Sequence, residues 1–263
     1  MVGVFKKIYY LIKNCRFHEG GMIHFLIMVA FGFFSSCSFI FNFDIFFILI
    51  ITLLMLGVNF QFNNAYDSDV DKYSRIKKKY NLVSMGLITK KDSIIFGILM
   101  AIFVLFLAFR INIVSFLIVL SIIIMGFFYS CPPIRLKKIP ILELIIHGIF
   151  YGSLLVFLGA AYNNIYNLET FTLAFIFFFI SIILQLSNHY VDYESDKRGN
   201  VMTTAIFLGK KQTIKLMRVL LFFVFALSVI FYLINFIRLI HLIFFIFYIG
   251  CNIILWRKFI LKR

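Results

Sequence analysis

Long apolar runs constrain this chain more than any other feature of its sequence. A helix crosses a bilayer with about 17–25 predominantly apolar residues. Eight runs near that length follow one another, and 45–61 is at the short end: 22–41, 45–61, 94–109, 113–130, 141–161, 171–190, 216–236 and 239–256. The chain is 63% apolar and 14% charged, with a mean hydropathy of +1.02, whereas soluble domains are nearer half apolar and a quarter charged. The sequence therefore predicts a polytopic membrane protein.

Backbone polar groups must be satisfied internally at membrane depth, so only helices and closed barrels can span. The apolar runs are continuous and lack the alternation of barrel strands, which excludes an outer-membrane barrel. We expect an all-α membrane helical bundle of about eight transmembrane helices. No linker interrupts residues 1–263, which predicts a single domain, and residues 1–20 resemble a short interfacial amphipathic helix.

Lysine and arginine are distributed unevenly between the two sides that these spans define. Of the 26 Lys and Arg residues, 24 lie before the first span, after the second, fourth and sixth, or in the tail, and Arg110 and Arg238 lie on the other side. Cytoplasmic loops carry an excess of basic residues. We therefore expect a multi-pass cell-membrane protein with both termini in the cytoplasm. The net charge of +15 is then a topology signal and a contact with anionic lipid, not a nucleic acid interface.

Two copies of one polar motif stand at the ends of the second and sixth runs. Each copy places an asparagine and two aspartates four residues apart, and the second copy starts 125 residues after the first (63 to 188). The spacing puts all three side chains of a copy on one helix face. The copies are Asn63, Asp67 and Asp71, and Asn188, Asp192 and Asp196. We interpret them as an internal repeat around a shared central cavity, with two Asp-rich cytoplasmic loops. Asp69 and Glu194 fall off that face and are expected to point to solvent or a nearby lysine.

Carboxylates four residues apart on a helix repel one another, so two such pairs at a membrane boundary require a compensating cation. Oxygen ligands of this kind suit Mg²⁺, which takes one or two carboxylates together with substrate phosphates. We therefore expect a diphosphate–Mg²⁺ site. A lone copy would more often be a solvated helix end, and a cation transporter would place its carboxylates nearer mid-span. Glu143 and His147, four residues apart, could equally line the cavity or pair with each other.

Four segments carry a resemblance to the UbiA-type intramembrane prenyltransferases, over about residues 20–256. "NNAYDSDVDKYSR" and "NHYVDYESDKRGNVMTTAIFLG" resemble the two Asp-rich motifs of that family. "NLVSMGLIT" resembles a segment usually read as Arg-Pro-Leu-x-Ser-Gly-x-Ile-Ser, and "YSCPPIRLKK" resembles the signature after the fourth span. Each segment alone is weak, but the four occur in the right order at the right spans.

The resemblance implies a helical bundle with a cavity open to lipid and Mg²⁺-dependent transfer of a prenyl group from an isoprenoid diphosphate. It implies that Asp67, Asp71, Asp192 and Asp196 hold the metal and act in catalysis. It also implies that the diphosphate is bound by neighbours from several spans, namely Asn63, Asn188, Arg75, Tyr129, Lys137 and Lys197. Basic residues at such positions are also what the topology signal alone would produce.

The chain departs from the family pattern in places. Asn81 and Leu82 stand where the family usually has Arg-Pro, Met85 stands at the usual serine, and the family commonly has nine spans. We expect a lipophilic acceptor, aromatic and similar to a quinone precursor. The alternatives are a related enzyme on the same fold, such as a terpene cyclase, carotenoid elongase, phosphoribosyl transferase or ether-lipid prenyltransferase, and a non-catalytic transport protein.

Overall fold

The computed structural model of the chain describes residues 3–19, 21–36, 44–74 and 77–261, with the backbone alone at 44 and 251–261. Over these residues it contains helices and no strand. The elements in chain order are α1 Val4–Lys13, α2 Met22–Ser35, α3 Asp44–Asp71, α4 Lys77–Tyr80, α5 Lys90–Ile111, α6 Ile113–Ser130, η1 Leu136–Lys138, α7 Leu142–Gly148, η2 Ile149–Ser153, α8 Leu154–Asn163, α9 Leu168–Arg198, α10 Thr204–Leu208, α11 Lys210–Leu233 and α12 Leu239–Leu261.

Every predicted apolar run falls on a helix, which confirms the all-α membrane bundle. Six helical segments are long and apolar enough to cross a bilayer, and two shorter apolar helices accompany them, Met22–Ser35 and Leu239–Gly250 over the described residues. The end of the first run, from 37 onward, lies outside the described residues. The fifth run is one continuous segment in which α7 passes through the single π-helical turn η2 into α8.

The two halves of the chain meet where α2 packs against α8. A Cβ at Gly32 on α2 would collide with the carbonyl oxygen of Val156, and a Cβ at Gly159 on α8 would collide with that of Val29. Glycine at both positions therefore lets the two backbones touch, as small residues do in membrane helix pairs. Since α2 opens the first half and α8 belongs to the first span of the second half, this contact joins equivalent parts of the repeat.

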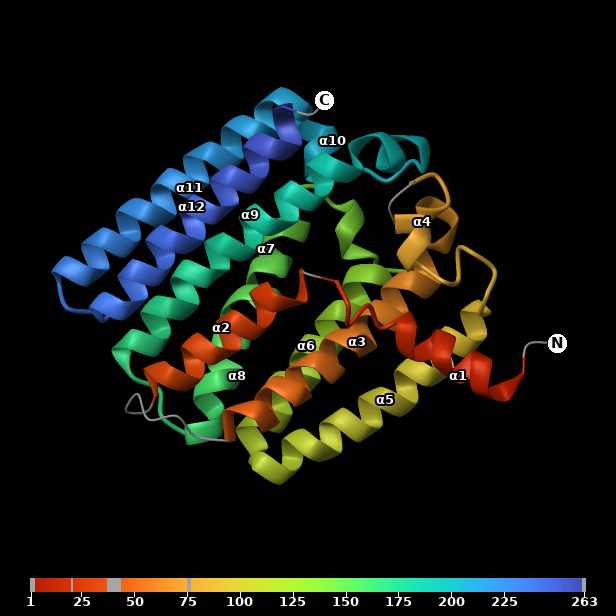
Figure 1. Cartoon of the computed structure of the whole chain (residues 1–263), viewed down its shortest axis with the longest axis horizontal. Coiled ribbons are helices and arrows are strands. Elements are labelled where there is room, and N and C mark those ends of the chain that lie inside the picture. The colour runs from red at the N-terminus through yellow and green to blue at the C-terminus, as the bar shows by residue number, and fades with distance from the viewer. Residues whose placement is uncertain (1–2, 20, 37–43, 75–76, 262–263) are drawn as a thin grey trace.

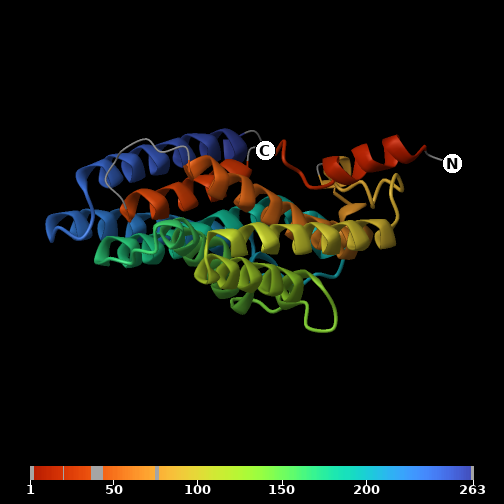
Figure 2. The same ribbon diagram turned by 90° about the horizontal axis from the view of Figure 1, so that it is seen from below.

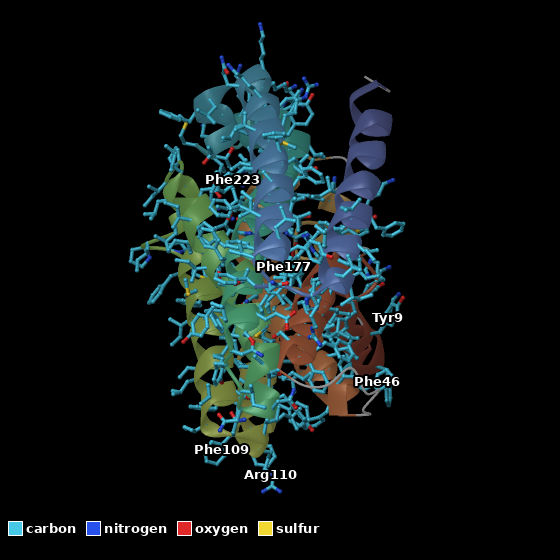
Figure 3. The ribbon with its side chains drawn as sticks, turned by 90° about the vertical axis from the view of Figure 1, so that its left-hand side faces the viewer. Tyr9, Phe46, Phe109, Arg110, Phe177 and Phe223 are labelled. Carbon is cyan, nitrogen blue, oxygen red and sulfur yellow. The ribbon has the colours of Figure 1, made fainter. Side chains whose placement is uncertain are left out.

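The Asp-rich ends of α3 and α9 lie at the same end of the bundle as α4 and α10 (Figure 1). Arg110, in the last turn of α5, lies at the opposite end, below the body of the bundle in Figure 3. Many outward side chains are large and apolar, such as Phe109 and Phe223, at 58% and 40% exposure, whereas Phe177 is fully buried. An apolar exterior suits lipid, whose tails are as apolar as leucine.

The N-terminal helix α1 lies at the edge of the bundle, beside the start of α5 (Figure 2). Leu11 packs against Leu82 and Ile88, and Lys7 Nζ lies 2.7 Å from Oδ1 of Asp92. The outer face of α1 exposes Phe5 at 90%. Apolar and basic side chains therefore share this short helix, as expected of a segment at a membrane interface.

Candidate functional site

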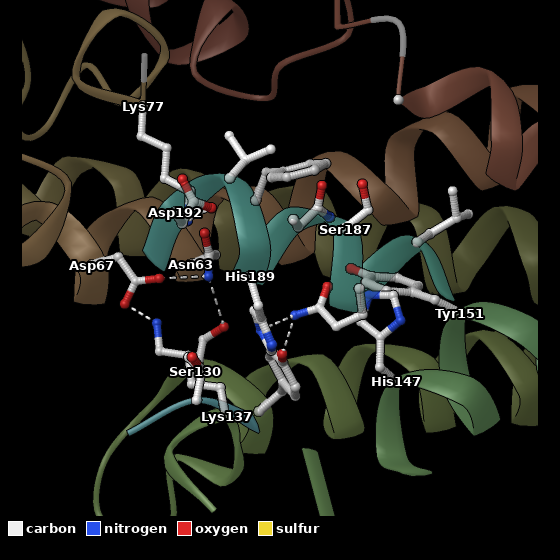
Figure 4. Close-up of a pocket in the computed structure, with 18 of the residues that line it drawn as sticks. Asn63, Asp67, Lys77, Ser130, Lys137, His147, Tyr151, Ser187, His189 and Asp192 are labelled. Atoms are coloured by element: carbon white, nitrogen blue, oxygen red, sulfur yellow. Dashed lines mark hydrogen bonds and ion pairs between the residues drawn. The ribbon is translucent and has the colours of Figure 1, made fainter. Parts of the chain in front are cut away.

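A cavity of about 570 Å³ lies between the two halves of the bundle. Its walls come from α3, α6, α7 and α9 and from the connections at the Asp-rich end (Figure 4). All six residues of the repeated motif line it, namely Asn63, Asp67, Asp71, Asn188, Asp192 and Asp196. The structure thus brings together two copies of one motif that are 125 residues apart in the chain (63 to 188).

The first motif is held by several side chains. Asp67, which is 8% exposed, accepts hydrogen bonds from Asn63 Nδ2 at 2.8 Å and from Arg135 Nη2 at 3.0 Å. The ammonium of Lys137 also contacts Asp67. Hydrogen bonds to charged groups are stronger than neutral ones, so this carboxylate is fixed in position before any ligand binds.

Asp71 is held by a loop that departs from the family pattern. Asn81 is fully buried; its Nδ2 donates to Oδ2 of Asp71 at 2.8 Å and to the carbonyl of Asn64 at 3.0 Å. Its Oδ1 accepts from the backbone N–H groups of Val83 and Ser84, both at 3.1 Å. The asparagine therefore organises the turn and orients the aspartate. A buried guanidinium, that of Arg16, lies 3.7 Å from Oδ2 of Asp71.

The second motif has fewer partners. Asp192 Oδ2 lies 2.7 Å from Nζ of Lys77, whose side chain is 34% exposed. Although burial lowers it, the nearby carboxylates of Asp192, Asp71 and Asp196 raise the pKa of Lys77 above its ordinary value. The side chain of Asp196 makes no hydrogen bond or ion pair with any described residue. Two aspartates thus share one cation here, and that cation comes from the first half of the chain.

Charge compensation at the site comes partly from the protein itself. Basic side chains contact Asp67 and Asp192 and approach Asp71. Within the described part of the chain, no three acidic, histidine or cysteine side chains converge closely enough to hold a metal ion by themselves. A cation bound here would take protein oxygens from one or two aspartates and the remaining ligands from a phosphate group, which is how Mg²⁺ is usually held.

The other predicted site residues differ in whether they line the cavity. Tyr129 and Lys137 line the cavity and are each 8% exposed. Lys197 is exposed and does not line the cavity. Arg75 lies outside the described residues. Both off-face acidic residues are exposed as predicted, and Glu194 Oε1 accepts from Lys210 Nζ at 2.7 Å.

A buried polar network beneath the second motif is absent from the sequence prediction. Glu143 is fully buried; its Oε2 accepts from Tyr129 Oη at 3.3 Å, and its Oε1 lies 3.2 Å from Nδ1 of His189. Gln185 Nε2 lies 2.7 Å from His189 Nε2 and 2.6 Å from Tyr129 Oη. Glu143 and His147 do not pair with each other: His147 lines the cavity, and its Nδ1 lies 2.9 Å from Ser181 Oγ. The available sequence signal was His189 itself, which follows Asn188 directly.

Comparison with known proteins identifies a family match and a shared fold. The model of the UbiA prenyltransferase family matches residues 25–263. No curated protein gives a significant match. Among solved structures, the chain resembles a UbiA homologue from Archaeoglobus fulgidus bound to GPP and Mg²⁺, with a TM-score of 0.79 and 21% identity, covering 97% of this chain and 88% of the other.

Two further solved structures share the architecture. One is a digeranylgeranylglyceryl phosphate synthase, with a TM-score of 0.66 and 18% identity over 94% of this chain and 88% of the other. The second is a UbiA homologue from Aeropyrum pernix K1 in its apo form, with a TM-score of 0.66 and 17% identity over 80% of this chain and 78% of the other. At these identities the likeness establishes the fold.

Proposed function

The chain belongs to the UbiA prenyltransferase family, and we propose that it transfers a prenyl group from an isoprenoid diphosphate to a lipophilic acceptor inside the membrane. The observation that carries this proposal is the convergence of two Asn-Asp-Asp helix faces on one cavity, with basic side chains between them. A diphosphate needs cations around it, and the transferred group needs an apolar space. The cavity offers both.

The donor set fits Mg²⁺. Asp67, Asp71, Asp192 and Asp196 supply only oxygen atoms, and they line the cavity from two sides, so that one or two of them can share the ion with the diphosphate. The similar homologue from Archaeoglobus fulgidus is bound to Mg²⁺ and GPP. When bound, the ion neutralises the diphosphate and stabilises it as a leaving group.

The side chains around the aspartates orient the diphosphate. Arg135 donates to Asp67 and does not line the cavity, so it positions that carboxylate. Lys137 and Lys77 already face the cavity. Asn63 and Asn188 present their amides from the two helices, and Tyr129 lies deeper in the wall.

The acceptor we favour is an aromatic one of the quinone-precursor kind; the paired prolines of the "YSCPPIRLKK" segment resemble those of enzymes with quinone-precursor, chlorophyll-type or archaeal ether-lipid acceptors. An ether-lipid acceptor is the second candidate, since the chain shares its fold with a digeranylgeranylglyceryl phosphate synthase. Mass spectrometry of membrane lipids and quinones, with and without expression of this chain, separates the two. The matched control is the Asp196→Ala variant at equal expression. A cyclised hydrocarbon, in place of a prenylated acceptor, would indicate a terpene cyclase instead.

We also propose that both termini and both Asp motifs face the cytoplasm, because 24 of 26 basic residues fall on that side of the spans. Cysteine substitution at Tyr166, in the turn before α9, tests the orientation. A membrane-impermeant thiol reagent should label position 166 from outside the cell. Labelling from the inside alone would refute it.

A further inference from the structure

Tyr129, Gln185, His189 and Glu143 form a closed ring of polar contacts in the cavity wall. Around the ring the separations are 2.6 Å from Gln185 to Tyr129, 3.3 Å from Tyr129 to Glu143, 3.2 Å from Glu143 to His189 and 2.7 Å from His189 to Gln185. All four side chains are at least nine-tenths buried. Buried polar groups are costly unless they are satisfied, so this ring fixes the orientation of its members.

The donors around Glu143 set the direction of the hydrogen bonds of Tyr129. Thr204 Oγ1 donates to Glu143 Oε1 at 2.7 Å and Tyr129 Oη donates to its Oε2 at 3.3 Å, so a donor reaches each oxygen of this carboxyl group. Tyr129 must then use its proton on Glu143 and accept from Gln185. His189 Nδ1 lies 3.2 Å from Glu143 Oε1 without hydrogen-bond geometry, and its Nε2 lies 2.7 Å from Nε2 of Gln185.

The amide of Gln185 is thereby oriented as well. Both of its N–H groups are used, one toward Tyr129 and one toward His189. Its Oε1 accepts no hydrogen bond from any described residue, and Gln185 lines the cavity. The ring thus presents one carbonyl oxygen, with both lone pairs unused, to whatever occupies this part of the cavity.

The two copies of the repeat differ at this depth, because the hydrogen-bond acceptor lies on the α9 wall and has no equivalent on the α3 wall. The position 125 residues before Gln185 is Phe60, which also lines the cavity. At equivalent depth below the Asp motifs, therefore, the α3 wall carries an aromatic ring and the α9 wall carries a hydrogen-bond acceptor. Gln185 precedes Asp192 by seven residues, about 10 Å along the helix. That depth lies below both Asp motifs; on the proposed function it is past the diphosphate, where an acceptor substrate would meet the prenyl group.

We propose that Gln185 Oε1 binds the acceptor substrate through a hydroxyl group of that acceptor, and that Glu143 and His189 are positioning residues that hold the amide. This assignment rests on the proposed function and narrows its acceptor to hydroxyl-bearing lipids, whether phenols or alcohols.

The test uses the full chain in lipid nanodiscs, with tritiated geranyl diphosphate as donor probe and total membrane lipid extract as the source of acceptor. The extract is supplied untreated or acetylated, which blocks its hydroxyl groups. Gln185→Met keeps the length of the side chain and removes its polar atoms. We expect the KM for the extract to rise about tenfold or more, the effect of one lost hydrogen bond in a buried site. Binding of geranyl diphosphate with Mg²⁺, measured by calorimetry, should stay unchanged.

Glu143→Gln should act in the same direction, because a neutral amide no longer forces the direction of the ring. Its control is Glu169→Gln: Glu169 forms a second, partly buried pair with a histidine, 2.7 Å from Nδ1 of His241, and also accepts from Arg238 Nε at 3.0 Å, outside the cavity. That variant should lower thermal stability and leave the KM for the extract unchanged.

Five results would overturn the assignment. Wild-type protein could prenylate the acetylated extract as well as the untreated one. Gln185→Met could keep the wild-type KM, or lose donor binding to the same degree. Glu169→Gln could raise the KM as much as Glu143→Gln does, so that any lost buried pair has this effect. If wild-type protein binds geranyl diphosphate and yields no product with either extract, the proposed transferase function fails, and the assignment fails with it.

Discussion

The two Asp motifs have the same sequence pattern but different surroundings. In the first, Asp67 has an amide, a guanidinium and an ammonium as partners, and Asp71 has Asn81. In the second, Asp192 has Lys77, and Asp196 has no side-chain partner in the described part of the chain. The first motif is therefore positioned by the protein, whereas the second retains uncompensated negative charge.

This difference assigns the two motifs unequal parts in one site. Preorganised charges act most strongly when they need not reorganise during the reaction, and the first motif meets that condition. The second motif, with one cation for two carboxylates, has more to gain from an added metal ion. Divalent metal should therefore matter most for the motif at the end of α9.

Removal of metal should have the largest effect. EDTA should abolish prenyl transfer, and Mg²⁺ or Mn²⁺ should restore it, because the two aspartates of α9 share a single lysine. Millimolar Mg²⁺ should also raise the affinity for geranyl diphosphate and the thermal stability of the liganded protein. Transfer at the full rate in metal-free buffer, with the chelator verified in excess, would mean that the basic residues of the cavity wall, such as Lys77 and Lys137, alone neutralise the diphosphate.

Loss of any one motif aspartate should come next. Asp67→Ala, Asp71→Ala, Asp192→Ala and Asp196→Ala should each lower turnover about 100-fold or more, the scale expected for preorganised charge stabilisation. Asp69→Ala and Glu194→Ala are the matched controls, because these two residues are exposed and lie off the motif face. An equal loss at Asp69 would show that the face of α3 does not define the site.

Stability should separate the two motifs. Asp67→Ala leaves Arg135 and Lys137 largely buried without their carboxylate, and breaking a buried ion pair in this way costs about 3–5 kcal/mol. Asp196→Ala removes no pair that the described residues form and relieves repulsion with Asp192, so stability should hold or rise. Thermal unfolding in metal-free detergent measures both. Equal losses for the two variants would remove the contrast between the motifs.

The fold and the aspartates were accessible from the sequence for one reason: both depend on local pattern. The apolar runs reflect the length of a membrane helix, and the i, i+4, i+8 spacing reflects one helix face, so neither needs tertiary information. The convergence of residues 63–71 and 188–196 on one cavity followed from the repeat, which carries tertiary information in the sequence.

The partners of these residues were not accessible, because they depend on loop geometry and long-range packing. Asn81 interrupted a family pattern, and the structure shows it buried against Asp71. Lys77 looked like one basic residue of a cytoplasmic loop, yet it crosses to Asp192 in the other half. Among many lysines placed by the positive-inside rule, sequence alone offers no means to find the one that reaches across the cavity.

Substitution of Lys77 should therefore have the smallest effect of these variants and give the most selective test. Its pKa is raised by the carboxylates that it faces, so the ammonium stays charged through the physiological range. The ion pair contributes stability below the ordinary pKa of lysine and loses it only as pH rises through the higher folded-state value. Because the side chain is 34% exposed, its loss should cost under about 1 kcal/mol of stability.

We expect Lys77→Gln to raise the KM for geranyl diphosphate by about fivefold, a change of about 1 kcal/mol, with a rise in the Mg²⁺ concentration needed for half-maximal rate. The metal then carries the charge that the lysine no longer supplies. Lys77→Arg should restore both values, and Lys78→Gln, a neighbour on α4 that does not line the cavity, is the control. An unchanged Mg²⁺ requirement in Lys77→Gln would show that the lysine and the metal act on different charges, and that the second motif is not the metal-dependent half of the site.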